Sequence, residues 1–271
     1  MKILLIMLTF IGLGLHDERG ISLRGLYEAK AADFVFAEFY TSLMPGLSQK
    51  HLEGLVGKSI EILSRADIEE KAEENLLRFA ERNKVAFLVP GDSMTATTHV
   101  DLRLRAAKKG IRTVIIHGVS VISAAASCMG LQSYKFGKTV TVPIAESGPL
   151  IETPYDVIKE NNKRGLHTLV LLDVKADLNQ YLLVGEALEQ LLAIERKRHE
   201  LVTDQDRLVV GAARIGSDDI VVKGGRIKDL SRYDFGGPPH LLVFPGRLHF
   251  MEVEALQVFA DTSKEALEAN V

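Results

Sequence analysis

The stretch Val85-Ala86-Phe87-Leu88-Val89-Pro90-Gly91-Asp92 decides the fold class predicted for this chain. An apolar run this short, bounded by turn residues, predicts a strand that is buried on both faces. Pro90 and Gly91 stop the strand, and Asp92 follows at once. Because open α/β sheets bind ligands just outside the carboxyl ends of their strands, this position favours ligand binding by Asp92 over simple capping of the next turn.

The first half of the chain repeats this pattern. Further strands are predicted over residues 8–13, 33–39 and 113–117, and segments of helical spacing over residues 22–30, 47–55, 68–82 and 100–109. Continuous apolar strands that alternate with helices are typical of a parallel sheet covered on both faces. We therefore expect an α/β fold in this half.

The second half is organised differently. It predicts strands over residues 139–144, 168–174, 208–213, 220–223 and 241–245, helices over 154–164, 181–198 and 249–260, and a hairpin turn at Gly224-Gly225. Strands and helices come partly in blocks, which favours a mixed sheet. A segment rich in Ser, Ala and Gly at 118–135 suggests two α/β domains, residues 1–120 and 121–271.

Composition narrows the classes of function. The net charge of −3 argues against nucleic-acid binding, and the single cysteine, Cys128, allows no internal disulfide and favours the cytoplasm. The apolar run at residues 3–11 is too short to span a membrane and lacks a cleavage site, so we expect a buried strand, with Met7 as an alternative start. The histidines show no metal-ligand spacing, and no metal is expected.

Three other motifs follow predicted strands. Gly12-Leu13-Gly14-Leu15 lets the backbone approach a ligand, although Asp17 replaces the third glycine of a nicotinamide-binding fingerprint and a plain tight turn stays possible. The segment 117–125 could shape a pocket, while Ser120 and Ser123 could cap a helix through the alanines. Before the last strand, His240 could point into a cleft between the domains or hydrogen-bond locally. The sequence contains no complete P-loop, kinase or hydrolase motif.

Several stretches together resemble the archaeal diphthine synthases, of the tetrapyrrole methylase-like superfamily. The resemblance covers nearly the whole chain apart from the first six or seven residues. Phe36-Ala37-Glu38-Phe39-Tyr40-Thr41-Ser42 and Gly165-Leu166-His167-Thr168-Leu169 are its most specific parts. It continues in the glycine turn and in residues 90–92, 96–99, 134–138, 156–161, 234–236 and 238–240.

This resemblance implies two α/β domains with a cofactor cleft between them, and usually a homodimer. It implies that S-adenosyl-L-methionine is the cofactor and that translation elongation factor 2 is the protein substrate, methylated on the amino group of a modified histidine. Carried over by motif, the cofactor-binding residues would be Leu15, Asp92, Thr95, Ser120, Val121, Leu172, Ile215 and His240. Ser93 and Met94 depart from the expected pattern, as do Thr95 and Ile215, and the proton acceptor of the reaction stays unidentified.

Two other functions stay open on the sequence. A methyltransferase of tetrapyrrole precursors would share the fold and the cofactor, although the residues 38–42 and 165–169 speak against it. A non-catalytic module could bind the cofactor and dock on a translation factor without turnover, because a fold alone does not imply an activity.

Overall fold

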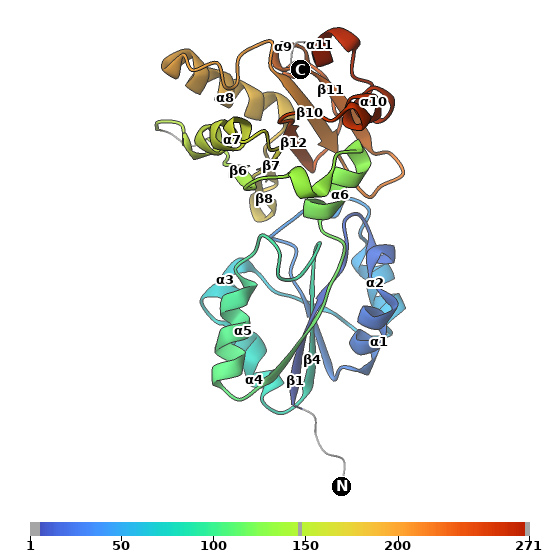
Figure 1. The fold of residues 1–271 in the computed structure, drawn as a ribbon. Coiled ribbons are helices and arrows are strands. Elements are labelled where there is room, and N and C mark those ends of the chain that lie inside the picture. Colours follow the sequence, from blue (N-terminus) through green and yellow to red (C-terminus); the bar gives the residue numbers. More distant parts are fainter. Residues whose placement is uncertain (1–5, 146–147, 269–271) are drawn as a thin grey trace. The chain divides into compact units, whose positions relative to one another are not determined.

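The computed structural model describes residues 6–145 and 148–268, and the chain divides into two compact units, Met1–Val121 and Ile122–Val271. Each unit holds its own β-sheet, flanked by its own helices (Figure 1). Each also has its own core of buried apolar side chains.

The first unit is built on a five-stranded sheet with the order β3-β2-β4-β1-β5. Its strands are β1 (Met7–Gly12), β2 (Phe34–Ala37), β3 (Glu61–Ile62), β4 (Lys84–Val89) and β5 (Arg112–Ile116). All neighbouring strands pair in parallel, so their carboxyl ends meet at one edge. The parallel sheet predicted for this half is confirmed.

Helices cover both faces of this sheet. α1 (Leu23–Ala31) and α2 (Gln49–Val56) lie on one face, and α3 (Arg65–Glu69), α4 (Arg78–Ala80) and α5 (His99–Lys108) lie on the other (Figure 1). Alternate side chains of β4 point to opposite faces, because strand side chains alternate. Val85, Phe87 and Val89 enter the core beneath α4 and α5, and Ala86 and Leu88 enter the core beneath α1 and α2.

The helical segment predicted over residues 68–82 is present but interrupted at residues 70–71. Reciprocal hydrogen bonds between Ser64 and Asp67 start the short helix α3 earlier, and it ends at Glu69. A wider π-helical turn, Glu73–Leu77, then leads into α4. The predicted apolar stripe still reaches the core, since Ala72 and Leu76 are fully buried.

The second unit contains a mixed five-stranded sheet with the order β11-β10-β12-β7-β6. Its strands are β6 (Val140–Val142), β7 (Thr168–Leu172), β10 (Leu208–Ala213), β11 (Val221–Arg226) and β12 (His240–Phe244). β6 and β7 run parallel, while β7, β12, β10 and β11 pair antiparallel. The predicted mixed sheet is confirmed. β8 (Val174–Lys175) and β9 (Gln180–Tyr181) form a small separate hairpin.

The helices of this half are α6 (Val121–Met129), α7 (Thr153–Lys163), α8 (Val184–Arg198), α9 (Ile227–Leu230), α10 (Phe250–Phe259) and α11 (Lys264–Glu268). The predicted turn at Gly224-Gly225 is wrong, because both glycines lie inside β11 and pair with Val210 and Val209. Residues 214–220 connect the two strands instead. Gly224 serves packing, since a β-carbon there would collide with the side chain of Thr262.

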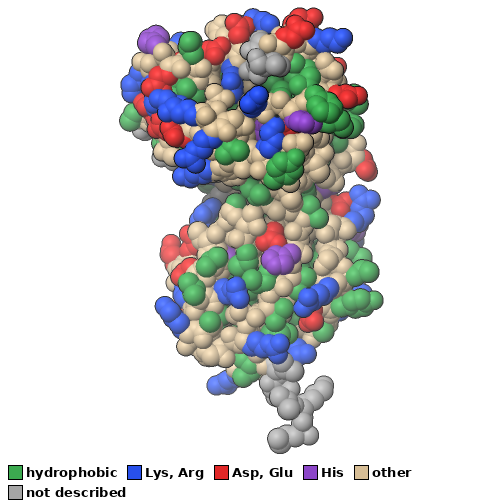
Figure 2. Space-filling model, viewed as in Figure 1, with side chains coloured by type: hydrophobic (Ala, Val, Ile, Leu, Met, Phe, Trp, Pro, Cys, Tyr) green, Lys and Arg blue, Asp and Glu red, His purple; other side chains and the backbone are tan. Residues whose placement is uncertain are grey.

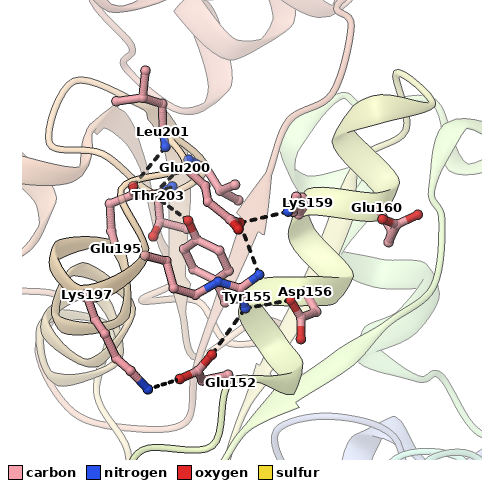
Figure 3. Close-up of polar contacts among 12 residues, drawn as sticks. Glu152, Tyr155, Asp156, Lys159, Glu160, Glu195, Lys197, Glu200, Leu201 and Thr203 are labelled. Carbon is pink, nitrogen blue, oxygen red and sulfur yellow. Dashed lines mark hydrogen bonds and ion pairs between the residues drawn. The ribbon is translucent and has the colours of Figure 1, made fainter.

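Polar contacts fix α7 to α8 (Figure 3). The Glu195 carboxylate accepts hydrogen bonds from the Tyr155 hydroxyl at 2.8 Å and from the backbone N–H groups of residues 201–203. The Arg198 guanidinium lies 4.5 Å from the centroid of the Tyr155 ring and pairs with Asp156 and Glu200. The stretch 156–161, which contributed to the resemblance, therefore includes residues of the scaffold.

Charged side chains of both signs are interspersed on the face shown in Figure 2. Large apolar side chains are exposed on α10, where Phe250 keeps 71% and Val258 keeps 68% of its surface accessible. Within the described residues, no helix is both long enough and apolar enough to cross a membrane.

Candidate functional site

Three glycines meet at the edge where the strands of the first unit end. A β-carbon built on Gly12 would lie 2.5 Å from the Gly118 nitrogen and 2.5 Å from the Gly91 oxygen. Gly14 and Gly91 exchange backbone hydrogen bonds of 3.2 and 2.7 Å. The ends of β1, β4 and β5 therefore approach so closely that only glycine fits, and their backbone atoms are left without covering side chains.

Asp92 follows β4 at this edge and is only 8% exposed. Its Oδ1 accepts hydrogen bonds from the Met94 N–H at 2.9 Å and the Thr95 hydroxyl at 3.2 Å, and its Oδ2 accepts one from His117 Nδ1 at 2.7 Å. Burial would raise the pKa of Asp92, but these hydrogen bonds outweigh it and hold the pKa below the ordinary 3.8. Asp92 thus caps the turn, and its ionised carboxylate also keeps capacity for a further donor.

His117, directly after β5, is the functional candidate that the sequence analysis missed. Its side chain is 75% exposed and reaches Asp92 across the end of β1. In the segment 117–125, a pocket was predicted from the small residues, and the imidazole of His117 was given no role. The available signal was that polar residues follow both β4 and β5, but the strand order that makes them neighbours was unknown.

The other candidates of the first unit gather at the same edge. Leu15 follows β1, Thr95 lies in the loop after β4, and Ser120 and Val121 follow β5. β1 lies between β4 and β5, so these three loops are neighbours. Val121 also begins α6, as expected if a helix runs through the alanines. Their contacts with a cofactor stay a prediction.

The three candidates of the second unit also share one sheet edge. Leu172 ends β7, His240 begins β12, and Ile215 comes two residues after β10, while β12 lies between the other two strands. All three are largely buried, with 6%, 9% and 6% of their surfaces exposed. Residues separated by up to 68 positions are thereby brought together, and their role in cofactor binding stays a prediction.

The His240 imidazole is held by its own unit. Its Nδ1 accepts a hydrogen bond from the Val184 N–H at 3.3 Å, and its Nε2 lies 3.1 Å from the carbonyl oxygens of Gly236 and Gly237. Burial lowers the pKa of His240 and the carbonyls oppose that shift. The local hydrogen bonding that the sequence left open is therefore present.

A buried polar bridge supports the loop that carries Asp92. Glu38, fully buried after β2, accepts hydrogen bonds from the Tyr40 and Thr41 N–H groups at 2.9 and 3.0 Å. The Tyr40 hydroxyl lies 3.4 Å from His99 Nε2, and His99 Nδ1 donates to the Ser93 carbonyl at 3.2 Å. Burial raises the pKa of Glu38 to about 7 and lowers that of His99 to about 4. No sequence pattern indicated this bridge, although Glu38, Tyr40 and His99 lie in stretches that resemble the diphthine synthases.

A second histidine–carboxylate pair lies inside the second unit. His167 Nε2 is 2.9 Å from Glu252 Oε1, and both side chains are fully buried. His167 Nδ1 accepts from the Gly246 N–H at 2.9 Å, while Glu252 also accepts from Lys135 and from the Gln132 and His249 N–H groups. Every one of these polar groups is satisfied inside the protein, so the pair is structural.

No three His, Cys, Asp or Glu side chains of the described residues are grouped in a way that could hold a metal ion. Burial raises the pKa of the Cys128 thiol, which disfavours the reactive thiolate. The groups available for chemistry at the first sheet edge are therefore a carboxylate, an imidazole, hydroxyls and glycine backbone.

Known proteins are similar to this chain in sequence and in fold. The profile of the family described as Tetrapyrrole (Corrin/Porphyrin) Methylases matches residues 7–231. A diphthine synthase of Methanosarcina mazei is 51% identical and covers 97% of this chain and 99% of its own length. One of Methanocella arvoryzae is 48% identical, with 94% and 98% covered. A crystal structure of diphthine synthase matches with a TM-score of 0.87 and 41% identity, covering 98% of this chain and 100% of that one.

The two α/β units and these matches define the chain as a member of the tetrapyrrole methylase family. The fold class and the enzyme class of methyltransferase, which the resemblance implied, are confirmed. Within this family the chain belongs to the diphthine synthases.

Proposed function

We propose that this chain transfers methyl groups from S-adenosyl-L-methionine to the amino group of the modified histidine in translation elongation factor 2, a step of diphthamide synthesis. The observation that carries the proposal is 51% identity with a diphthine synthase over almost the full length of both chains. Elongation factor 2 acts in the cytoplasm, where we also place this reaction. We further infer that the chain works as a homodimer, which light scattering of the purified protein tests.

Each sheet edge, taken by itself, offers groups that suit this cofactor. When bound, S-adenosyl-L-methionine supplies an activated methyl carbon, while the protein supplies binding and orientation. Asp92, Thr95 and Ser120 offer oxygens to hydroxyl and ammonium groups, and the glycines at positions 12, 91 and 118 leave the nearby backbone uncovered. Apolar contacts would come from Leu15, Val121, Leu172 and Ile215. Since both His240 nitrogens are engaged within its unit, we infer that His240 contributes its ring surface or its backbone.

The decisive experiment is transfer of labelled methyl to elongation factor 2 that carries aminocarboxypropyl-histidine, followed by mass spectrometry of the modified peptide. We expect mass to be added to that histidine in methyl steps, which also counts the transfers. A parallel reaction with a tetrapyrrole precursor tests the rival substrate. Cofactor binding in calorimetry without transfer to either acceptor would contradict the proposal and favour a non-catalytic module.

The Asp92→Ala variant tests the proposed cofactor site. Loss of a hydrogen bond to a charged group costs about 1.5–3 kcal/mol, so we expect cofactor affinity to fall by roughly 10–150-fold in a folded protein. Calorimetric titration measures the affinity, and circular dichroism verifies the fold. Asp67→Ala is the matched control. The Asp67 carboxylate also accepts a hydrogen bond from a nearby backbone N–H, that of Ser64, but it caps α3 and does not follow a strand. Equal cofactor affinities in the two variants would show that Asp92 does not bind the cofactor.

A further inference from the structure

His117 and Asp92 form an imidazole–carboxylate pair that opens to solvent on one side only. The histidine side chain is 75% exposed, whereas the aspartate side chain is 8% exposed. The aspartate also accepts from Met94 and Thr95, which fix the carboxylate in the loop after β4. The carboxylate is therefore a rigid partner, and the imidazole presents its far edge outward.

The hydrogen bond of 2.7 Å between His117 Nδ1 and Asp92 Oδ2 determines the tautomer. The ionised carboxylate of Asp92 can only accept, so Nδ1 must carry the proton. In the neutral imidazole the lone pair then lies on Nε2. No hydrogen bond joins this nitrogen to a group of residues 6–145 and 148–268, and the side chain is 75% exposed, so a proton donor from outside the chain can reach it.

The strand ends are shaped so that this pair can form. β4 and β5 flank β1, and the spacing of neighbouring strands places them about 9–10 Å apart. The residue of β1 that lies between them is Gly12, and any side chain there would collide with Gly91 and Gly118. Glycine at this point lets an imidazole from β5 reach a carboxylate from β4 over the middle strand.

We propose that His117 is the catalytic proton acceptor of the methyl transfer and that Asp92 orients it. The inference rests on the proposed function, because it assumes an amine substrate. Amines of this kind are protonated at neutral pH and have no lone pair until a proton leaves. A base that is held in one tautomer by a carboxylate is the arrangement used for proton removal in many enzymes.

Each transfer begins with removal of a proton from the substrate. Nε2 of His117 takes a proton from the substrate ammonium, and the nitrogen keeps the electron pair of the broken N–H bond. This pair forms the bond to the methyl carbon as the carbon–sulfur bond breaks, and the electrons of that bond stay on sulfur. The imidazolium then releases its proton to water at the exposed edge. After a third transfer the nitrogen would carry no proton, so the need for a base ends there.

The chain contains a matched control in the same unit. His51 Nδ1 lies 3.4 Å from Glu18 Oε1, with 73% of the histidine side chain and 11% of the glutamate side chain exposed. The chemistry and exposure of this pair match those of His117 and Asp92, but His51 lies on α2 and does not follow a strand. His51→Ala therefore reports what removal of an exposed, paired histidine does by itself.

A first test needs neither cofactor nor substrate. Nitrogen NMR of the labelled histidines in the free protein should show His117 with its proton on Nδ1 when neutral, and Asp92→Asn should disturb this preference. A neutral His117 with its proton on Nε2 would overturn the proposal, because that nitrogen could then accept no proton. The His117→Ala spectrum assigns the signal.

The second test is the rate of methyl transfer by the full-length protein as a function of pH. His117→Ala should lower the single-turnover rate by about 10²–10⁴-fold at saturating cofactor, the usual contribution of a general base. The deficit should shrink as pH rises, since more of the amine is then neutral without help, and added imidazole should restore part of the rate. His51→Ala should keep the wild-type rate and profile.

The outcomes separate the two proposals. If the wild type transfers no methyl, the proposed function fails, whatever the variants do. If the wild type is active and His117→Ala keeps its rate, the inference about His117 fails alone. It also fails if the loss is explained by weaker cofactor binding in calorimetry, or if the pH profile stays parallel to wild type and imidazole has no effect.

Discussion

Among the described residues, the histidine–carboxylate pairs His117–Asp92 and His167–Glu252 have nearly the same length but very different surroundings. His117 and Asp92 are joined by 2.7 Å at the edge of the first sheet, and His167 and Glu252 by 2.9 Å inside the second unit. His117 is 75% exposed, while both members of the second pair are fully buried. Distance alone therefore does not tell a reactive pair from a structural one.

The difference lies in the second nitrogen of each imidazole. His167 uses both, one toward Glu252 and the other as acceptor for the Gly246 N–H. It can neither take nor give a proton without breaking a buried hydrogen bond, which costs stability. His117 uses one nitrogen, and the other meets solvent. A buried pair with all its positions filled holds a fold together, whereas a pair with one free, accessible position can do chemistry.

The largest effect should follow removal of the buried carboxylate. Glu252→Ala leaves Lys135 without its carboxylate partner and two backbone N–H groups without an acceptor. Breaking a buried ion pair by deleting one partner costs about 3–5 kcal/mol, and we expect the free energy of unfolding to fall by that amount. Urea denaturation measures it. Glu254→Ala, an exposed glutamate two residues further on α10, is the control, and equal losses in both variants would show that Glu252 has no special role.

Acid should weaken the same cluster. Burial would raise the pKa of Glu252, but hydrogen bonds from Lys135 and its other donors lower it from 4.5 to about 2. A carboxyl with a lowered folded-state pKa stabilises the protein above its unfolded pKa, and this contribution is lost as pH falls from about 4.5 to about 2. The shift corresponds to about 3 kcal/mol. Urea denaturation at several acidic pH values should show a flatter slope for Glu252→Gln than for wild type, and parallel slopes would contradict the assignment.

Replacing the buried histidine should cost less than replacing its carboxylate. His167→Leu leaves the Gly246 N–H and Glu252 Oε1 each one partner short, and an unsatisfied buried group costs about 1–3 kcal/mol. A double-mutant cycle with Glu252→Ala, followed by denaturation, should give a coupling energy of about 0.5–3 kcal/mol. Strict additivity would mean that the two side chains do not act as a pair.

The sequence alone predicted those elements whose signal is local. The apolar run 85–89 and the residues around it indicated β4, and the recurrence of such runs indicated a parallel sheet. The helical segment over 68–82 was predicted without its break at residues 70–71, because α3 ends at Glu69 and the π turn Glu73–Leu77 then carries the apolar stripe into the core. Gly224 and Gly225 were mistaken for a turn because glycine required by packing and glycine required by a turn look the same in one sequence.

The site could be predicted only in part, since the rest depends on which strands are neighbours. Asp92 was found because it follows a strand, and the structure adds that it caps its own turn. His117 lies 25 residues away and becomes its partner only because β1 separates β4 from β5. The hydrogen bond between His167 and Glu252 joins residues that lie 85 positions apart in the sequence, and no local sequence pattern indicates it.

The smallest effect on stability should come from the pair that we propose to be catalytic. The His117 side chain is 75% exposed, and substitutions of exposed side chains stay within about 0.5 kcal/mol, so His117→Ala should barely change the free energy of unfolding. Urea denaturation curves of His117→Ala and His167→Leu, recorded side by side at neutral pH, measure the difference in free energy of unfolding between the two variants. If His117→Ala instead destabilised the protein as much as His167→Leu, the Asp92–His117 pair would be a structural brace of the sheet edge. Any loss of methyl transfer would then follow from a displaced loop and not from a missing base.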